Sequence, residues 1–262
     1  MDPFQPLLAN ALTFAFEKAT IEGKITISAL VIVSMISWSV IITKGRQILK
    51  ARAATKRFLA AFREIEDPMQ LFREKREFPG APAYEVYAMG CGELEYHLEN
   101  NPVTVKGQKR ISLESFQSVQ VALERGVSAE ALSLEKGMII LTTAVAGGPF
   151  IGLLGTVWGV METFSGIAMA ASASLTAMAP GVAGALIATV VGLFVAIPAM
   201  FAYNLMITSI RGITQELDNF NSEIMTDLEH RYVDNRALAD EIADALRNLN
   251  LGQAPQGPAT RP

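Results

Sequence analysis

The stretches GGPFIGLLGTVWGVMETF, residues 147–164, and APGVAGALIATVVGLFVAIPAMFAYN, residues 179–204, decide the fold of this chain. Between Lys136 and Arg211, Glu162 is the only Asp, Glu, Lys, Arg or His. A helix needs about 20 apolar residues to cross a hydrocarbon core of about 30 Å. The pattern therefore predicts transmembrane helices over residues 137–164 and 181–207, joined by a loop over residues 165–180.

A third apolar stretch, residues 25–43, is also long enough to cross. It follows residues 1–24, whose apolar positions repeat at helical spacing and predict an amphipathic segment in the membrane interface. Six basic residues crowd the exit of this first span, whereas the 165–180 loop has no Lys or Arg. The positive-inside rule therefore places the N-terminus and the 165–180 loop on the outer side of the membrane and the C-terminus in the cytoplasm.

Two charged regions flank the later spans. Residues 44–136 carry 15 Lys and Arg against 13 Asp and Glu. They predict a cytoplasmic helical region with breaks near Pro68, at residues 78–82 and at residues 101–110, whose last helix runs straight into the second span. Residues 208–250 predict a helix that continues the third span, and residues 251–262 a disordered tail. The fold class is an all-α membrane protein with three transmembrane helices, the second and third extended into a cytoplasmic helical bundle.

An apolar seam in this last helix predicts packing against neighbouring helices, and we expect a lone subunit to leave the seam wet. Its members recur every three or four positions: Ile210, Ile213, Leu217, Phe220, Ile224 and Leu228. The seam thus favours assembly of several subunits into an oligomeric ring.

Small residues form stripes on both central spans, and such stripes let membrane helices approach closely. The positions are Gly148, Gly152, Gly155 and Gly159 on one helix, and Gly184, Ala188, Gly192 and Ala196 on the other. One reading is that they merely hold the hairpin together. The other is that two stripes serve more partners than one hairpin supplies.

Thr156 and Thr189 lie roughly 9 to 12 Å below the outer face, at one predicted depth, because a helix rises about 1.5 Å per residue. Each hydroxyl can bond back to its own helical turn. Alternatively, the two belong to a polar ring that holds water and passes protons. Threonine does not titrate near neutral pH, so a titrating group would have to come from elsewhere.

Residues 152–161 (GLLGTVWGVM), 179–184 (APGVAG) and 188–204 (ATVVGLFVAIPAMFAYN) resemble the signature of the MotA/TolQ/ExbB proton-channel family, nearer to its ExbB and TolQ branch. The resemblance implies a homo-oligomer, a pentamer, around an ExbD- or TolR-like single-span partner that carries the titrating aspartate. It also implies a bacterial inner membrane, so that residues 1–24 and the 165–180 loop would be periplasmic. A TonB- or TolA-like protein is a further implied partner. The resemblance also implies that Thr156 and Thr189 line the lumen. The remaining motif positions shape the helices: Pro149, Trp158, Pro180, Pro198 and Asn204.

The chain departs from the family at Gly184, where many ExbB and TolQ sequences carry a glutamate. The role of that acid does not transfer to this position. Glu162 could replace it in ion entry from the other helix, since ionisable groups in membranes are often functional. The alternative is a solvated carboxylate at the outer interface.

The composition excludes several other classes of function. The chain has two histidines and one cysteine, without a phosphate-binding loop, a catalytic triad pattern or a metal-ligand cluster. We therefore expect no enzyme, no cofactor and no metal, and the balanced charge excludes a nucleic-acid partner.

The predicted function is a proton-channel subunit that couples proton motive force to work at the outer membrane. A sodium-coupled stator and a non-conducting membrane scaffold stay open, as does the choice between ExbB-type and TolQ-type processes.

Overall fold

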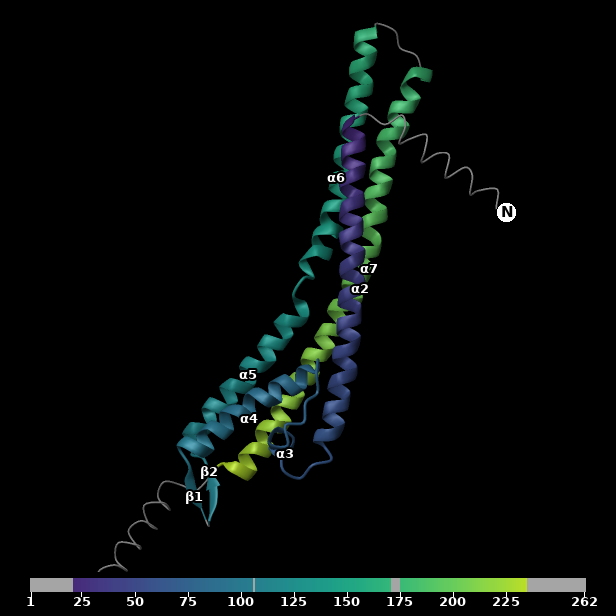
Figure 1. Ribbon diagram of the computed structural model, residues 1–262. Coiled ribbons are helices and arrows are strands. Elements are labelled where there is room, and N and C mark those ends of the chain that lie inside the picture. Colours follow the sequence, from purple (N-terminus) through teal and green to yellow (C-terminus); the bar gives the residue numbers. More distant parts are fainter. Residues whose placement is uncertain (1–20, 106, 171–174, 235–262) are drawn as a thin grey trace, which may run out of the picture. The chain divides into compact units, whose positions relative to one another are not determined.

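The computed structural model describes residues 21–105, 107–170 and 175–234, which are almost entirely helical (Figure 1). The long helices are α2 (Ile21–Phe62), α4 (Pro82–Asn100), α5 (Leu113–Glu135), α6 (Ile139–Ala170) and α7 (Leu175–Tyr232). Helix α3 (Gln70–Arg73) and strands β1 (Val103–Val105) and β2 (Gln108–Arg110) are short. Three long apolar stretches, within α2, α6 and α7, suffice to cross a membrane, which confirms the predicted fold class. Residues 1–20 of the predicted amphipathic segment 1–24 lie outside the described residues, and residues 21–24 belong to α2. Residues 235–250 of the predicted last helix and the predicted tail 251–262 also lie outside the described residues.

The chain divides into two compact units. The membrane unit contains the described residues up to 57, residues 79–81 and residues 129–216, except the undescribed 171–174. The polar unit contains residues 58–78 and 82–128 and the described residues from 217 onward.

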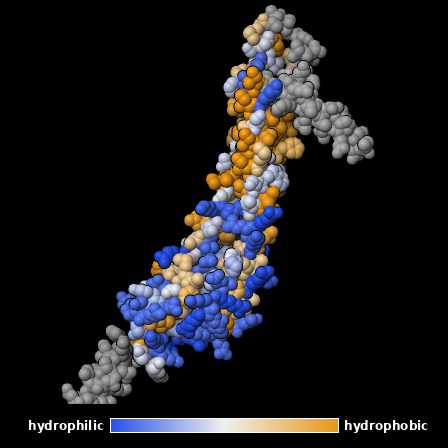
Figure 2. All heavy atoms as spheres, viewed as in Figure 1, coloured by the Kyte–Doolittle hydropathy of each residue, from blue (hydrophilic) through white to orange (hydrophobic). Residues whose placement is uncertain are grey.

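The membrane unit packs α2, α6 and α7 side by side (Figure 1). Large apolar side chains cover its outside, as the orange surface in Figure 2 shows. Phe150 and Phe194 are 71% and 74% exposed. Exposed apolar side chains on all three of these helices are expected where lipid replaces water as the solvent.

The predicted loop over residues 165–180 is wrong at both of its ends. Helix α6 continues to Ala170 and α7 already begins at Leu175. The segment has no charged residue and is rich in alanine, which is the best helix former. Nothing in its composition therefore ends the helices as early as the apolar count suggested.

The predicted continuous helix from the polar region into the second span is also wrong. Helix α5 ends at Glu135, and a turn with Gly137 at φ +88° precedes α6. Glycine adopts this left-handed conformation without a Cβ clash. The Lys44 ammonium of α2 donates to the carbonyl oxygens of Ser133 and Leu134 at 3.4 and 3.3 Å, where α5 leaves its last carbonyls without helical partners.

The polar unit is built around an aromatic core. Phe58 is fully buried, and its ring lies 5.4 Å from Tyr87 and 5.4 Å from Phe220, centroid to centroid. Ser112 caps the start of α5, where the Ser115 N–H donates to the Ser112 hydroxyl at 3.2 Å. Serine is one of the residues favoured at this position, because its hydroxyl accepts an N–H that the first helical turn leaves without a partner.

Helix α7 continues without a break past the third span, as predicted, but its seam is not wet in the single chain. All six seam residues from Ile210 to Leu228 are at most 2% exposed. The chain's own helices cover them. The seam therefore gives no argument for a ring, because a periodic pattern identifies the buried face of a helix without identifying what buries it.

A β-hairpin stands where only a helix break was predicted. Val103 pairs with Arg110 and Val105 with Gln108 in antiparallel register, and Gly107 has φ +81° in the connection. The Ile111 N–H donates to the Tyr232 carbonyl at 2.8 Å. This bond ties the end of the hairpin to the end of α7.

Candidate functional site: a hydroxyl pair between two apolar helices

Thr156 of α6 and Thr189 of α7 are brought together, and their hydroxyl groups are hydrogen-bonded to each other. The Thr156 hydroxyl also lies 3.1 Å from the Gly152 carbonyl oxygen and 3.2 Å from that of Ala185. The Thr189 hydroxyl lies 3.2 Å from the Gly152 carbonyl oxygen. Two hydroxyls and two carbonyls thus form one half-buried polar cluster inside an apolar helix pair.

The carbonyls of this cluster do not depend on the hydroxyls. In an α-helix the Gly152 carbonyl accepts the Thr156 N–H, and the Ala185 carbonyl accepts the Thr189 N–H. A hydroxyl that rotates toward another acceptor therefore leaves no carbonyl unsatisfied. The cluster can offer a donor to an incoming anion or water at low cost.

Close backbone approach explains why the two threonines meet. A Cβ added to Gly152 would lie 2.8 Å from the Ala188 carbonyl oxygen and 2.9 Å from the Thr189 Cα. Both neighbours are backbone atoms, which cannot move aside cheaply. A glycine at position 152 is therefore needed for this helix separation.

The two predicted stripes face each other along the whole contact. Gly148 packs on Gly192 and Ala196, and Gly159 packs on Ala185. Gly184 and Ala188 are also buried. The stripes are thus used within one hairpin, and the interpretation that they must serve additional partners is not needed.

Gly155 brings a third helix to the site. A Cβ at this position would lie 2.7 Å from the Ala188 Cβ and 2.8 Å from the Thr26 hydroxyl oxygen of α2. Thr26 is 7% exposed, and its hydroxyl donates to the Gly23 carbonyl at 2.9 Å. Thr26 was missed by the sequence reasoning because one threonine at the start of an apolar span carries no periodic signal.

The other predicted site residues lie outside this cluster. Glu162 and Asn204 are exposed, and Trp158 is 42% exposed. Pro149 and Pro198 are half-buried within α6 and α7, where each removes one backbone donor from its helix. Pro180 lies near the start of α7. The structure does not bring Glu162 into contact with either threonine.

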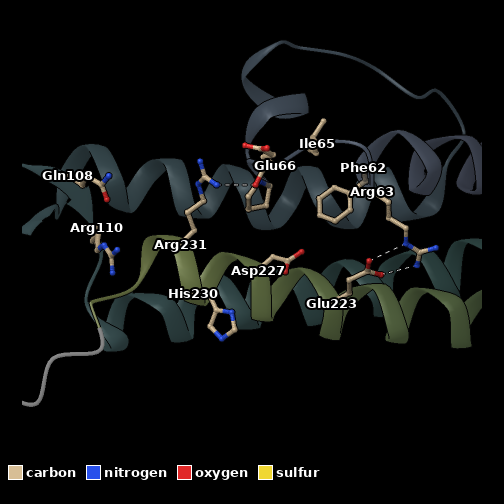
Figure 3. Close-up of a pocket in the computed structure, with 11 residues that line it drawn as sticks. Phe62, Arg63, Ile65, Glu66, Gln108, Arg110, Glu223, Asp227, His230 and Arg231 are labelled. Carbon is tan, nitrogen blue, oxygen red and sulfur yellow. Dashed lines mark hydrogen bonds and ion pairs between the residues drawn. The ribbon is translucent and has the colours of Figure 1, made fainter.

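A hollow with a volume of about 650 Å³ lies in the polar unit (Figure 3). Arg63 donates to both carboxylate oxygens of Glu223, at 3.1 and 3.0 Å. Arg231 donates to the Glu66 carbonyl at 3.0 Å. Three arginines and three carboxylates line the hollow, so their charges balance and do not indicate a site for phosphate or nucleic acid. The arginines are Arg63, Arg110 and Arg231, and the carboxylates are Glu66, Glu223 and Asp227.

Asp67 anchors the end of α7 beside this hollow. Burial alone would raise the pKa of its carboxyl, but hydrogen bonds from the Tyr232 hydroxyl (2.6 Å) and the Met69 N–H (3.0 Å) oppose this effect. With the charges of Arg73 and Arg231, they hold the pKa below its ordinary value. Burial and the bond to Asp67 raise the pKa of Tyr232 to about 12. This network ties the connection between α2 and α3 to the end of α7, which is a structural role.

The described structure therefore defines a multi-pass membrane protein with a half-buried pair of hydroxyls between two glycine-packed helices. Residues 97–219 match the MotA/TolQ/ExbB proton channel family. The chain belongs to this family.

Individual relatives agree with this assignment. The chain is 34% identical over 218 residues to the Tol-Pal system protein TolQ of Haemophilus influenzae, covering 82% of this chain and 92% of the relative. It is 31% identical to the biopolymer transport protein ExbB of Pseudomonas putida, over 82% of this chain and 64% of the relative. It is 32% identical to TolQ of Pseudomonas aeruginosa, over 71% and 78% of the two chains. The family is one of membrane channel subunits rather than of catalytic enzymes.

Proposed function

We propose that this chain is the proton-channel subunit of an ExbB–ExbD or TolQ–TolR type complex in the bacterial inner membrane. The family match supports the channel role, and the relatives named TolQ and ExbB support both client systems equally. The observation that carries the assignment of the route is the contact between Thr156 and Thr189 inside an otherwise apolar helix pair.

In the proposed mechanism, several copies of the chain, a pentamer by family resemblance, surround an ExbD- or TolR-like partner that supplies an aspartate. Threonine hydroxyls do not titrate near neutral pH, so the partner's carboxylate binds and releases the proton. A charged carboxylate is costly in a low-dielectric lumen, and protonation removes that cost. The Thr156 and Thr189 hydroxyls would donate to the charged form and hold water beside it.

The alternation of charge would rotate the ring and the partner relative to each other. A TonB- or TolA-like protein would pass this work to the outer membrane. In the proposed topology the α6–α7 connection lies in the periplasm and the end of α7 in the cytoplasm. Glu162, exposed near the outer end of α6, would lie at ion entry. The chain itself would conduct rather than catalyse.

Proton uptake by liposomes tests this proposal. The chain is reconstituted with its ExbD- or TolR-like partner, and uptake is recorded under an imposed potential beside the chain alone. We expect uptake that needs the partner and falls in Thr189→Val. Thr143→Val is the matched control, because Thr143 is an exposed threonine of α6 whose hydroxyl bonds back to Ile139 at 2.8 Å.

The outcomes separate the alternative functions. Uptake that follows sodium at fixed pH would indicate a sodium-coupled stator, since hydroxyl and carbonyl oxygens also ligate that ion. Absence of uptake from a correctly assembled complex would contradict the channel proposal and favour a scaffold. Normal uptake in Glu162→Gln would remove Glu162 from the mechanism.

A further inference from the structure

We propose that Thr26 of α2 is a positioning residue for the proton route, and that its hydroxyl oxygen sets the placement of α6 at the Thr156–Thr189 pair. This inference rests on the proposed function. Thr26 contacts Gly155, the residue before Thr156, so it acts through the pair rather than on the proton itself.

Gly155 of α6 fits closely between two other helices. The Cβ position of Gly155 is 2.7 Å from the Ala188 Cβ on one side and 2.8 Å from the Thr26 oxygen on the other. Helix α6 is thus confined at this residue by α7 and α2 together. Because Thr156 is the next residue on a rigid helix, a rotation or shift of α6 at Gly155 moves the Thr156 hydroxyl as well.

The atom of Thr26 that lies nearest to the Cβ position of Gly155 is its hydroxyl oxygen. The Thr26 hydroxyl donates to the Gly23 carbonyl, and this bond fixes the rotamer that turns the oxygen toward Gly155. Carbon and oxygen settle at about 3.3–3.6 Å, whereas two carbons settle at about 3.5–4.0 Å. The oxygen therefore allows a closer approach of α2 to α6 than a methyl group at the same place.

Three substitutions separate the oxygen from the shape of the side chain. Thr26→Ser keeps the oxygen and its bond to Gly23, Thr26→Val keeps the shape, and Thr26→Ala keeps neither. Ser28→Ala is the matched control. Ser28 lies in the same turn of α2 and also bonds back to its own helix, at 2.7 Å from the Lys24 carbonyl, but it is exposed.

The measurement is proton uptake by the reconstituted complex with its partner, normalised to assembled protein. We expect Thr26→Ser and Ser28→Ala to match the wild type. We expect proton uptake to fall about fivefold in Thr26→Val and in Thr26→Ala. A factor of this size corresponds to the loss of one neutral hydrogen bond.

The pH at half-maximal uptake gives a readout that mere loss of assembly would not move. A donor to a charged carboxylate lowers its pKa, so loss of the donor raises it. Thr156→Val should shift the half-maximum to higher pH, and Thr26→Ala should shift it in the same direction by less.

The result that would overturn the inference is wild-type uptake in Thr26→Val with a fall in Thr26→Ser, since shape alone would then matter. Unchanged uptake in all three variants, or a fall without any pH shift, would overturn it too. If Thr156→Val conducts normally, the proposed function fails and this inference fails with it. If Thr156→Val loses uptake while the Thr26 variants do not, only the inference fails.

Discussion

The two units hold their helices together by opposite means. In the membrane unit, Gly152 brings α6 so near to α7 that an added Cβ would lie 2.8 Å from a backbone oxygen. In the polar unit, Phe58, Phe62 and Phe220 fill the space between helices, with ring centroids 5.2–6.0 Å apart. Burial of large apolar side chains is favourable in water but not in lipid. Membrane helices therefore gain stability from close helix–helix contact instead.

Phe58→Ala should have the largest effect, confined to the polar unit. Truncation of a fully buried phenylalanine costs about 3–5 kcal/mol, because the cavity is added to the lost transfer free energy. Hydrogen exchange of the full chain in detergent should show faster exchange in α4 and α5 and unchanged exchange in the α6–α7 contact. Tyr96→Ala, at a 56% exposed aromatic of α4, is the control. Equal effects of the two truncations would contradict the aromatic-core account.

Gly152→Val should disrupt the membrane unit by overpacking. A well-packed site loses about 1–3 kcal/mol when extra carbons are forced into it, and here the neighbours are backbone atoms. The midpoint of thermal unfolding in detergent should fall. Gly147→Val makes the same change five residues earlier in α6, where nothing lies within 4 Å of the Cβ position, and should leave the midpoint nearly unaltered. If the midpoint falls equally in both variants, the low helix propensity of valine, and not the contact between α6 and α7, causes the loss.

The Asp67 network should make the polar unit sensitive to acid. Its folded pKa is held below the unfolded value of about 4, so its stabilisation is fully present above that value and is lost as the pH falls through the folded pKa. The raised pKa of Tyr232 makes the polar unit sensitive to alkali as well. Its contribution to stability is present below about pH 10 and is lost as the pH rises through about 12. Urea unfolding of the polar unit in the full chain should lose its acid-dependent part in Asp67→Asn. An unchanged acid limb would exclude Asp67 as its cause.

Arg63→Met should have the smallest effect. The ion pair with Glu223 is bidentate, but the two side chains are 62% and 35% exposed, and such pairs contribute about 0–1 kcal/mol. The difference from wild type should shrink further in 1 M salt, where exposed charges are screened. A salt-independent loss of several kcal/mol would show that the arginine stem, and not the ion pair, holds this part of the polar unit.

The membrane unit was the more predictable of the two. Apolar length and glycine spacing depend on local sequence, and they indicated three spans and placed Thr156 and Thr189 at one depth. Apolar length and glycine spacing could not show which helix packs against each apolar or small-residue face. The stripes of α6 and α7 proved to face each other, and the seam from Ile210 to Leu228 proved to be buried by the same chain.

The β-hairpin and the turn between α5 and α6 were not predicted, although both have local sequence signals. Val103, Thr104 and Val105 are residues with high strand propensity, and Gly107 follows at a turn, a pattern that favours a hairpin. Gly137 directly after Lys136 is a helix stop signal. Thr26 had no such signal, because its importance arises only when α2 lies against Gly155.

The most direct test of the central claim is a double-mutant cycle on proton uptake by the reconstituted complex. Thr156→Val, Thr189→Val and the double variant are compared with the wild type, each normalised to assembled protein. If the two hydroxyls act as one donor cluster on the proton route, each single change removes most of the uptake and the double change costs little more. Uptake that stays at the wild-type level in the assembled double variant would contradict the claim.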